Sequence, residues 1–128
     1  MILADTSIVV AVWRNPTRRL LDLVIDHDAA VCGISTAELY AGARIPRQVA
    51  RCAAVLSAFR QIALPESVWQ SVGHNLAELA AAGVTVPFPD AVIATVAIEE
   101  NVELWSADKH FALMQSVLTN LRLFQEPP

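Results

Sequence analysis

Four acidic residues stand where short apolar strands are expected to end or where neighbouring helices are expected to begin. Asp5 closes the first apolar stretch, residues 2 to 5, and Glu38 lies in the first turn of the helix after the second stretch. Asp108 follows the third stretch by two residues, and Asp90 begins the helix before it. Functional crevices of parallel α/β sheets lie outside the carboxyl ends of the strands. We therefore expect all four carboxylates at one edge, provided that the connector before Asp90 returns the chain there.

Carboxylates gathered at one edge have a defined chemistry. Several negative charges within a few ångströms raise one another's pKa, and a divalent cation removes that repulsion. Oxygen ligands without a histidine or cysteine cluster suit Mg²⁺ or Mn²⁺ rather than Zn²⁺. Such an ion can activate a water molecule and neutralise negative charge on a phosphodiester. The four acids therefore predict a hydrolytic metal site.

Each acid also has a purely structural interpretation. Asp5 and Asp108 both precede an expected helix and are candidates for its N-cap. Glu38 follows Ser35 by three residues, which is the capping-box pattern. Asp90 lies in the first helical turn of "PFPDAVIATVAIEE", where it complements the helix dipole. From the pattern alone, helix caps and a metal site both stay open.

The elements that would position these acids alternate between strand and helix. Apolar runs predict strands at residues 2–5, 29–34, 102–106 and 121–124. Helical spacing predicts helices at residues 6–13, 16–27, 35–44, 46–63, 65–83, 87–100 and 108–117, the fourth and fifth forming a helical hairpin. In the sixth helix, Asp90 shares a face with Ile93, Ala94 and Ala97. The opposite, solvent-facing side carries Glu99, Thr95 and Val92. The alternation predicts a single α/β domain over residues 1–128, a three-layer sandwich with a short central parallel sheet of four or five strands.

Composition limits the classes of partner and compartment. With a net charge of −4 and a pI near 5.2, the chain is not expected to hold nucleic acid by bulk charge. Hydrophobic residues make up 55% of 128 residues, more than a small core needs, which predicts an oligomer or an obligate partner. Two isolated cysteines, Cys32 and Cys52, suit a reducing cytoplasm, and no apolar run is long enough to span a membrane.

Four segments together resemble a PIN-domain protein of the VapC toxin type. They are "LADTS" at residues 3–7, "STAELYAGAR" at 35–44, "PDAVIATVA" at 89–97 and "LWSADKHF" at 104–111. The segments occur in the family's order, and the resemblance covers essentially the whole chain. It implies a PIN-like fold and a metal-dependent endoribonuclease, usually the toxin of a bacterial or archaeal toxin–antitoxin pair.

The resemblance assigns roles to individual residues. Asp5, Glu38, Asp90 and Asp108 match the family's acidic metal-site positions, which implies Mg²⁺ or Mn²⁺ as cofactor and a phosphodiester of tRNA, rRNA or mRNA as substrate. Thr6 matches a hydroxyl that supports the first Asp, and Ser106 stands where relatives often have Thr. Many relatives carry another acid where this chain has His110. This departure leaves a second metal ion in doubt, and His110 is interpreted here as a surface residue.

Partners follow from the same resemblance and from the charges. An antitoxin protein laid over the early helices and a second copy of the chain would both use the apolar surplus. Arg14, Arg18, Arg44 and Arg47 are candidates for phosphate contact, because a guanidinium suits phosphate; surface charge and antitoxin contact are their alternatives.

Two other functional interpretations stay open. A haloacid-dehalogenase-like phosphatase also has an Asp after its first strand, but it wants a second Asp where this chain has Ser7. A PIN-like scaffold that binds a partner and cleaves nothing would lack some of the acids, and the four main ones are all present.

Overall fold

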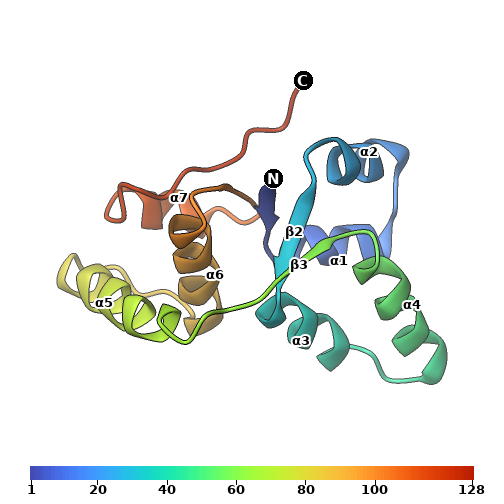
Figure 1. The fold of residues 1–128 in the computed structure, drawn as a ribbon, viewed down its shortest axis with the longest axis horizontal. Coiled ribbons are helices and arrows are strands. Elements are labelled where there is room, and N and C mark those ends of the chain that lie inside the picture. The colour runs from blue at the N-terminus through green and yellow to red at the C-terminus, as the bar shows by residue number, and fades with distance from the viewer.

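A computed structural model describes residues 1–128 (Figure 1). Along the chain lie β1 (Ile2–Ala4), α1 (Thr6–Arg14), α2 (Arg18–Asp26), β2 (Ala29–Cys32), α3 (Gly33–Ala41), α4 (Pro46–Leu56), β3 (Arg60–Ile62), α5 (Val68–Ala81), α6 (Phe88–Glu99), β4 (Glu103–Trp105) and α7 (His110–Gln115). The alternation of strands and helices predicted from the sequence is confirmed.

The strands form one parallel sheet in the order β3-β2-β1-β4. Ile2 of β1 pairs with Ala29 of β2 on one side and with Glu103 of β4 on the other. Because β1 is central, the residue that follows it emerges in the middle of the carboxyl edge. The predicted three-layer α/β fold with a short parallel sheet is thus confirmed, with four strands.

The strand predicted at residues 121–124 is wrong in extent. Only Leu123 forms a bridge, to Leu104 of β4. The Leu104 N–H donates to the Arg122 carbonyl, and the Phe124 N–H donates to the Leu104 carbonyl. The tail therefore crosses the edge of the sheet at one point and does not run along it.

The predicted helical hairpin of residues 46–63 and 65–83 is also wrong. Helix α4 ends at Leu56, and residues 60–62 pair with β2 as strand β3, with Val31 opposite Gln61. Helix α4 packs against α1 and α3, whereas α5 packs against α6 on the other side of the sheet (Figure 1). The apolar spacing does not change at Leu56, so the strand is fixed by pairing with β2 rather than by local pattern.

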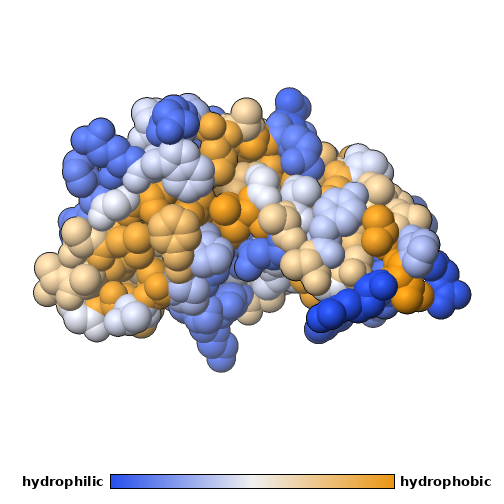
Figure 2. Space-filling model, turned by 90° about the horizontal axis from the view of Figure 1, so that it is seen from below, coloured by the Kyte–Doolittle hydropathy of each residue, from blue (hydrophilic) through white to orange (hydrophobic).

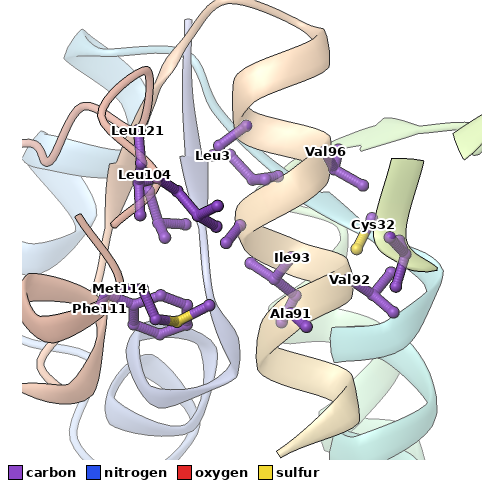
Figure 3. Packing of buried hydrophobic residues seen from close by; sticks show 14 of the residues in the cluster. Leu3, Cys32, Ala91, Val92, Ile93, Val96, Leu104, Phe111, Met114 and Leu121 are labelled. Carbon is purple, nitrogen blue, oxygen red and sulfur yellow. The ribbon is translucent and has the colours of Figure 1, made fainter. Parts of the chain in front are cut away.

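Alternate strand residues face two separate cores. One cluster of 17 buried residues contains Leu3 and Leu104 and lies under α5, α6 and α7 (Figure 3). The other cluster of 14 contains Ile2 and Trp105 and lies under α1 to α4. The period-two alternation of strand side chains thus joins three layers into one structure.

The middle turns of helix α6 are buried on all sides, which corrects the predicted solvent-facing side for Val92 and Thr95, whereas Glu99 is exposed as predicted. Every residue from Ala91 to Ala97 is buried, including Val92 and Thr95. The Thr95 hydroxyl donates to the Ala91 carbonyl (2.7 Å) and accepts from the Asn75 amide of α5 (2.9 Å). Helix α5 covers the face of α6 that was predicted to face solvent, so the polar partners of Thr95 are protein groups rather than water.

None of the helices combines the length and apolar character that crossing a bilayer requires. Cys32 and Cys52 are both buried and form no disulfide.

Candidate active site

Asp5 lies at the carboxyl end of the central strand and is the most enclosed acid of the predicted set. It is the N-cap of α1, its Oδ1 accepting from the Ile8 N–H (3.3 Å) and from the Ser7 hydroxyl (2.5 Å). Its Oδ2 accepts from the Ser106 hydroxyl (2.6 Å). Only 4% of Asp5 is exposed, so the carboxylate is fixed from both sides.

Ser7 and Ser106 also hold the loop after β4. The Ala107 N–H donates to Ser7 Oγ (3.0 Å), and the Asp108 N–H donates to Ser106 Oγ (2.9 Å). Two hydroxyls therefore tie the end of β1 to the segment that carries Asp108. Ser7 was missed as a supporting residue, although a hydroxyl two residues after a strand-end Asp is the signal that could have found it.

Thr6 does not support the first Asp as the resemblance implied. Its hydroxyl donates to Glu38 Oε1 (2.6 Å) and also reaches Ser35 Oγ (3.1 Å). Thr6 begins α1 and points toward α3, whereas Ser7 points toward β4. The acid that Thr6 holds is therefore Glu38.

The capping interpretation holds for Asp5 alone. Helix α3 has Cys32 as its N-cap, so Ser35 and Glu38 lie inside the helix and form no capping box. Helix α7 begins after Lys109 without a side-chain cap, and no backbone N–H donates to the carboxylate of Asp90 or of Asp108. Glu38 and Asp108 thus have no capping role, whereas Asp90 lies in the first turn of α6, where it complements the helix dipole as predicted.

His110 is exposed, as its interpretation as a surface residue predicted, but it also lies among the acids. Its Nε2 is 2.7 Å from Asp108 Oδ2 and 3.4 Å from Asp90 Oδ2. One possible ligand atom from each of these three residues lies within 4.8 Å of the others. The connector after α5 has returned the chain to this edge, which was the condition for Asp90 to join it.

The electrostatics connect all four acids. Burial raises the pKa of Asp90, the His110 charge lowers it, and the charges of Asp108, Asp5 and Glu38 raise it again. Burial also raises the pKa of Asp5, opposed by the hydrogen bonds from Ser106 and Ser7. A partly buried carboxylate whose pKa is raised by neighbouring negative charges, as that of Asp90 is, is a group whose charge a divalent cation would stabilise. Their oxygen donors fit Mg²⁺ or Mn²⁺.

Two hollows flank the acidic edge. The first, about 170 Å³, is lined by Glu38, Gly42 and Arg14 together with apolar residues of α1, α3 and α4: Val10, Trp13, Leu39, Ala43 and Cys52. The second, also about 170 Å³, is lined by Ser106 and Asp108 together with the tail residues 123–126. The acids thus lie between two recesses.

The other predicted arginines lie outside these hollows. Arg18 is almost fully exposed and faces Asp22 of its own helix at 3.9 Å. Arg44 and Arg47 are exposed at the start of α4. Arg14 is the predicted arginine that lines a hollow with an acid of the site.

Comparison with known proteins agrees with this fold. The PIN-domain family model matches residues 2–116. The chain belongs to the PIN-domain family. No curated protein matches it.

Solved PIN-domain structures of similar fold come from toxin–antitoxin complexes. A chain of VapBC2 from Rickettsia felis, bound to a DNA fragment from the promoter, has a TM-score of 0.84 at 23% identity, covering 99% of this chain and 100% of that one. A chain of DNA-bound VapBC from Salmonella typhimurium has a TM-score of 0.79 at 19% identity, and the match covers 97% of this chain and 98% of that one. A chain of VapBC-1 from nontypeable Haemophilus influenzae has a TM-score of 0.77 at 16% identity, and the match covers 97% of each chain. This PIN domain therefore has the fold found in VapBC complexes, as the resemblance implied.

Proposed function

We propose that this PIN-domain protein is a metal-dependent endoribonuclease and the toxin of a type II toxin–antitoxin pair. The observation that supports the proposal is a series of contacts at the carboxyl edge of the sheet. Ser106 joins Asp5 to the loop that carries Asp108, and His110 Nε2 lies 2.7 Å from Asp108 and 3.4 Å from Asp90. Membership of the PIN-domain family supports it, and the phosphatase alternative has lost its support because Ser7 serves Asp5 as a hydrogen-bond donor.

The exposure of the four acids and their contacts indicate which of them would bind the metal ion directly. Asp5 and Asp90, the less exposed pair, would hold a divalent ion, with Glu38 and Asp108 beside them or acting through water. A bound Mg²⁺ or Mn²⁺ ion would supply an activated water and neutralise the charge of the scissile phosphate. Ser7, Ser106 and Thr6 would keep Asp5 and Glu38 in fixed rotamers, because their hydroxyls donate to those carboxylates.

The hollows on either side of the acids suggest the path of the substrate. A strand of tRNA, rRNA or mRNA crossing the edge would pass Arg14 and Glu38 on one side and Asp108 on the other. Arg14 is the first candidate for phosphate contact, with Arg44 and Arg47 as exposed charges farther along. The products would carry a 5′-phosphate and a 3′-hydroxyl.

Two protein partners account for the apolar surface. We assign the antitoxin to the first hollow, which is mostly apolar and includes Trp13, whose buried indole N–H has no hydrogen-bond partner. We assign a second copy of the chain to the face near α5, where Trp69 is 41% and Phe88 is 55% exposed. Figure 2 shows apolar side chains gathered over the half of the molecule on the α5 side. Both partners suit a cytoplasmic protein.

The test is cleavage of total cellular RNA by the purified chain with Mn²⁺, with Mg²⁺ and with EDTA. Wild type would be compared with Asp90→Asn and Glu38→Gln, and with Glu99→Gln as a matched control, since Glu99 is an exposed acid on the same helix as Asp90. Discrete cuts with a 5′-phosphate are expected in wild type and Glu99→Gln, only with metal.

Two results would contradict the proposal. Cuts that persist in EDTA or in Asp90→Asn would come from a contaminating nuclease or from other chemistry. A folded wild type that binds no Mn²⁺ and makes no cuts would leave the protein as a PIN-like scaffold.

A further inference from the structure

The imidazole of His110 is a metal-ligating group inside the acidic site. Asp90 comes from the first turn of α6, Asp108 from the loop after β4 and His110 from the start of α7. Nε2 lies 2.7 Å from Asp108 Oδ2 and 3.4 Å from Asp90 Oδ2, and the three ligand atoms lie within 4.8 Å of one another. Ligands held about 2.1 Å from one ion are themselves about 3 to 4 Å apart, so small side-chain shifts would let these three share an ion.

This group differs in chemistry from the rest of the site. Asp5 and Glu38 offer carboxylate oxygens only, and hydroxyls of Ser7, Ser106 and Thr6 already direct them. Mg²⁺ is bound through oxygen, whereas a neutral imidazole nitrogen binds transition-metal ions well. The side chain of His110 is 44% exposed, which leaves a path for an ion to enter from solvent.

We propose that Asp90, Asp108 and His110 form a second metal site that takes a transition-metal ion in preference to Mg²⁺, with His110 Nε2 as a ligand. Asp90 would belong to both sites, since it is one of the two carboxylates proposed to hold the first ion and its Oδ2 also lies 3.4 Å from His110 Nε2. In the bound state Nε2 would offer its lone pair to the ion, and the neutral ring would carry its one proton on Nδ1. The second site rests on the proposed metal-dependent function and deepens it.

The test uses Mn²⁺ and Mg²⁺ as probes and tag-free protein, so that no other histidine cluster is present. Isothermal titration would give the number of bound ions, and pulsed electron paramagnetic resonance of bound Mn²⁺ would detect a directly bonded ¹⁴N nucleus. Wild type is expected to bind two Mn²⁺ ions, one with nitrogen coupling, and only one Mg²⁺ ion.

Three variants separate the ligand from its surroundings. His110→Ala should lose the nitrogen coupling and weaken the second Mn²⁺ ion by about tenfold or more, while the first is retained. His110→Asp should lose the coupling but gain a second Mg²⁺ ion, because the site then holds oxygen only. His74→Ala is the matched control, since His74 is exposed on α5 and makes no polar contact. Circular dichroism would verify that each variant is folded.

The outcomes distinguish this inference from the function on which it rests. Nitrogen coupling that is absent in wild type, or that survives in His110→Ala, would overturn the second site while leaving the nuclease proposal intact. Equal numbers of Mg²⁺ and Mn²⁺ ions in wild type would overturn the selectivity. No binding of either ion would overturn both proposals.

Discussion

Two serine hydroxyls fix the most buried carboxylate of the site and also hold the loop that carries Asp108. Ser106 has both tasks at once, because it donates to Asp5 Oδ2 and accepts from the Asp108 N–H. A hydrogen bond to a charged group contributes about 1.5 to 3 kcal/mol. The serines therefore contribute to the stability of the fold and to the geometry of the acids.

Replacing Ser106 with alanine should affect both properties. We expect Ser106→Ala to lower the free energy of unfolding by about 2 kcal/mol and to weaken Mn²⁺ binding by about tenfold. Urea denaturation and calorimetric titration measure the two effects. Ser116→Ala is the control, since that exposed hydroxyl donates only to the Leu113 carbonyl. Equal stability of the two variants would show that Ser106 does not hold Asp5.

The charge of Asp90 is unfavourable in the protein without an ion. Its pKa is raised above the usual 3.8, first by burial and then by Asp108, Asp5 and Glu38, against the opposing charge of His110. The folded state therefore binds the proton more tightly than the unfolded state does. This contribution to stability is fully present below the unfolded pKa and is lost as the pH rises through the folded pKa.

Asp90→Asn should accordingly stabilise the ion-free protein near neutral pH, by about 1 kcal/mol. The gain should disappear below the unfolded pKa, and added Mn²⁺ should stabilise wild type but not the variant. Urea denaturation in EDTA across a pH series, with Glu99→Gln beside it, measures this. An Asp90→Asn protein less stable than wild type at neutral pH would show that the carboxylate is needed for folding.

At the scale of elements, α6 is positioned by burial on every side. Thr95 links it to α5 through the Asn75 amide and to its own first turn through the Ala91 carbonyl. Since α6 carries Asp90, this buried polar contact also sets where that carboxylate lies.

Thr95→Val keeps the shape of the side chain and removes both bonds. It leaves the Asn75 amide unpaired, so the free energy of unfolding should fall by about 1 to 2 kcal/mol. Thermal or urea denaturation measures this, with Thr119→Val as the exposed control. A change no larger than in the control would mean that water replaces the hydroxyl at no cost.

Sequence pattern predicted the elements of the site better than those far from it. Strand β1 and its Asp5 could be predicted because a short apolar run ends in an acid. The four acids at strand ends and helix starts could be predicted to lie together because a parallel sheet brings these positions to one edge. Strand β3 could not be predicted in this way, because Arg60 and Gln61 are exposed and their pairing with β2 alone makes them a strand. The depth of α6 was missed because helical periodicity does not report a second covering helix.

The side-chain contacts of the site were less predictable than its acids. Thr6 and Ser7 are adjacent hydroxyls, and which one reaches Asp5 depends on the direction of α1. His110 looked like a surface residue because nothing in its segment indicates that α6 approaches it.

At the scale of the molecule, two apolar surfaces remain on opposite sides of the sheet. The first hollow is formed by helices α1, α3 and α4, and the exposed Trp69 belongs to α5 on the other face. Assigning the antitoxin to one and a second copy to the other predicts that the two associations can be broken separately.

Two variants test that separation. Gly42 lines the first hollow, and a Cβ there would meet only the Leu39 carbonyl at 3.6 Å, so Gly42→Leu should fill the space without straining the backbone. We expect it to weaken binding of the cognate antitoxin by about tenfold or more and to leave the dimer intact. Trp69→Glu should do the reverse, since a charge at the centre of an apolar contact costs several kcal/mol.

Sedimentation velocity of the chain alone and calorimetric titration with the antitoxin measure the two associations in each variant. Ile25→Glu is the control for a charge placed on an exposed apolar residue, because Ile25 is 70% exposed on α2, away from α5. A monomeric Gly42→Leu, or a Trp69→Glu that no longer binds the antitoxin, would exchange the two assignments. The second copy of the chain would then cover the first hollow beside Glu38, and the antitoxin would have to inhibit from the α5 face.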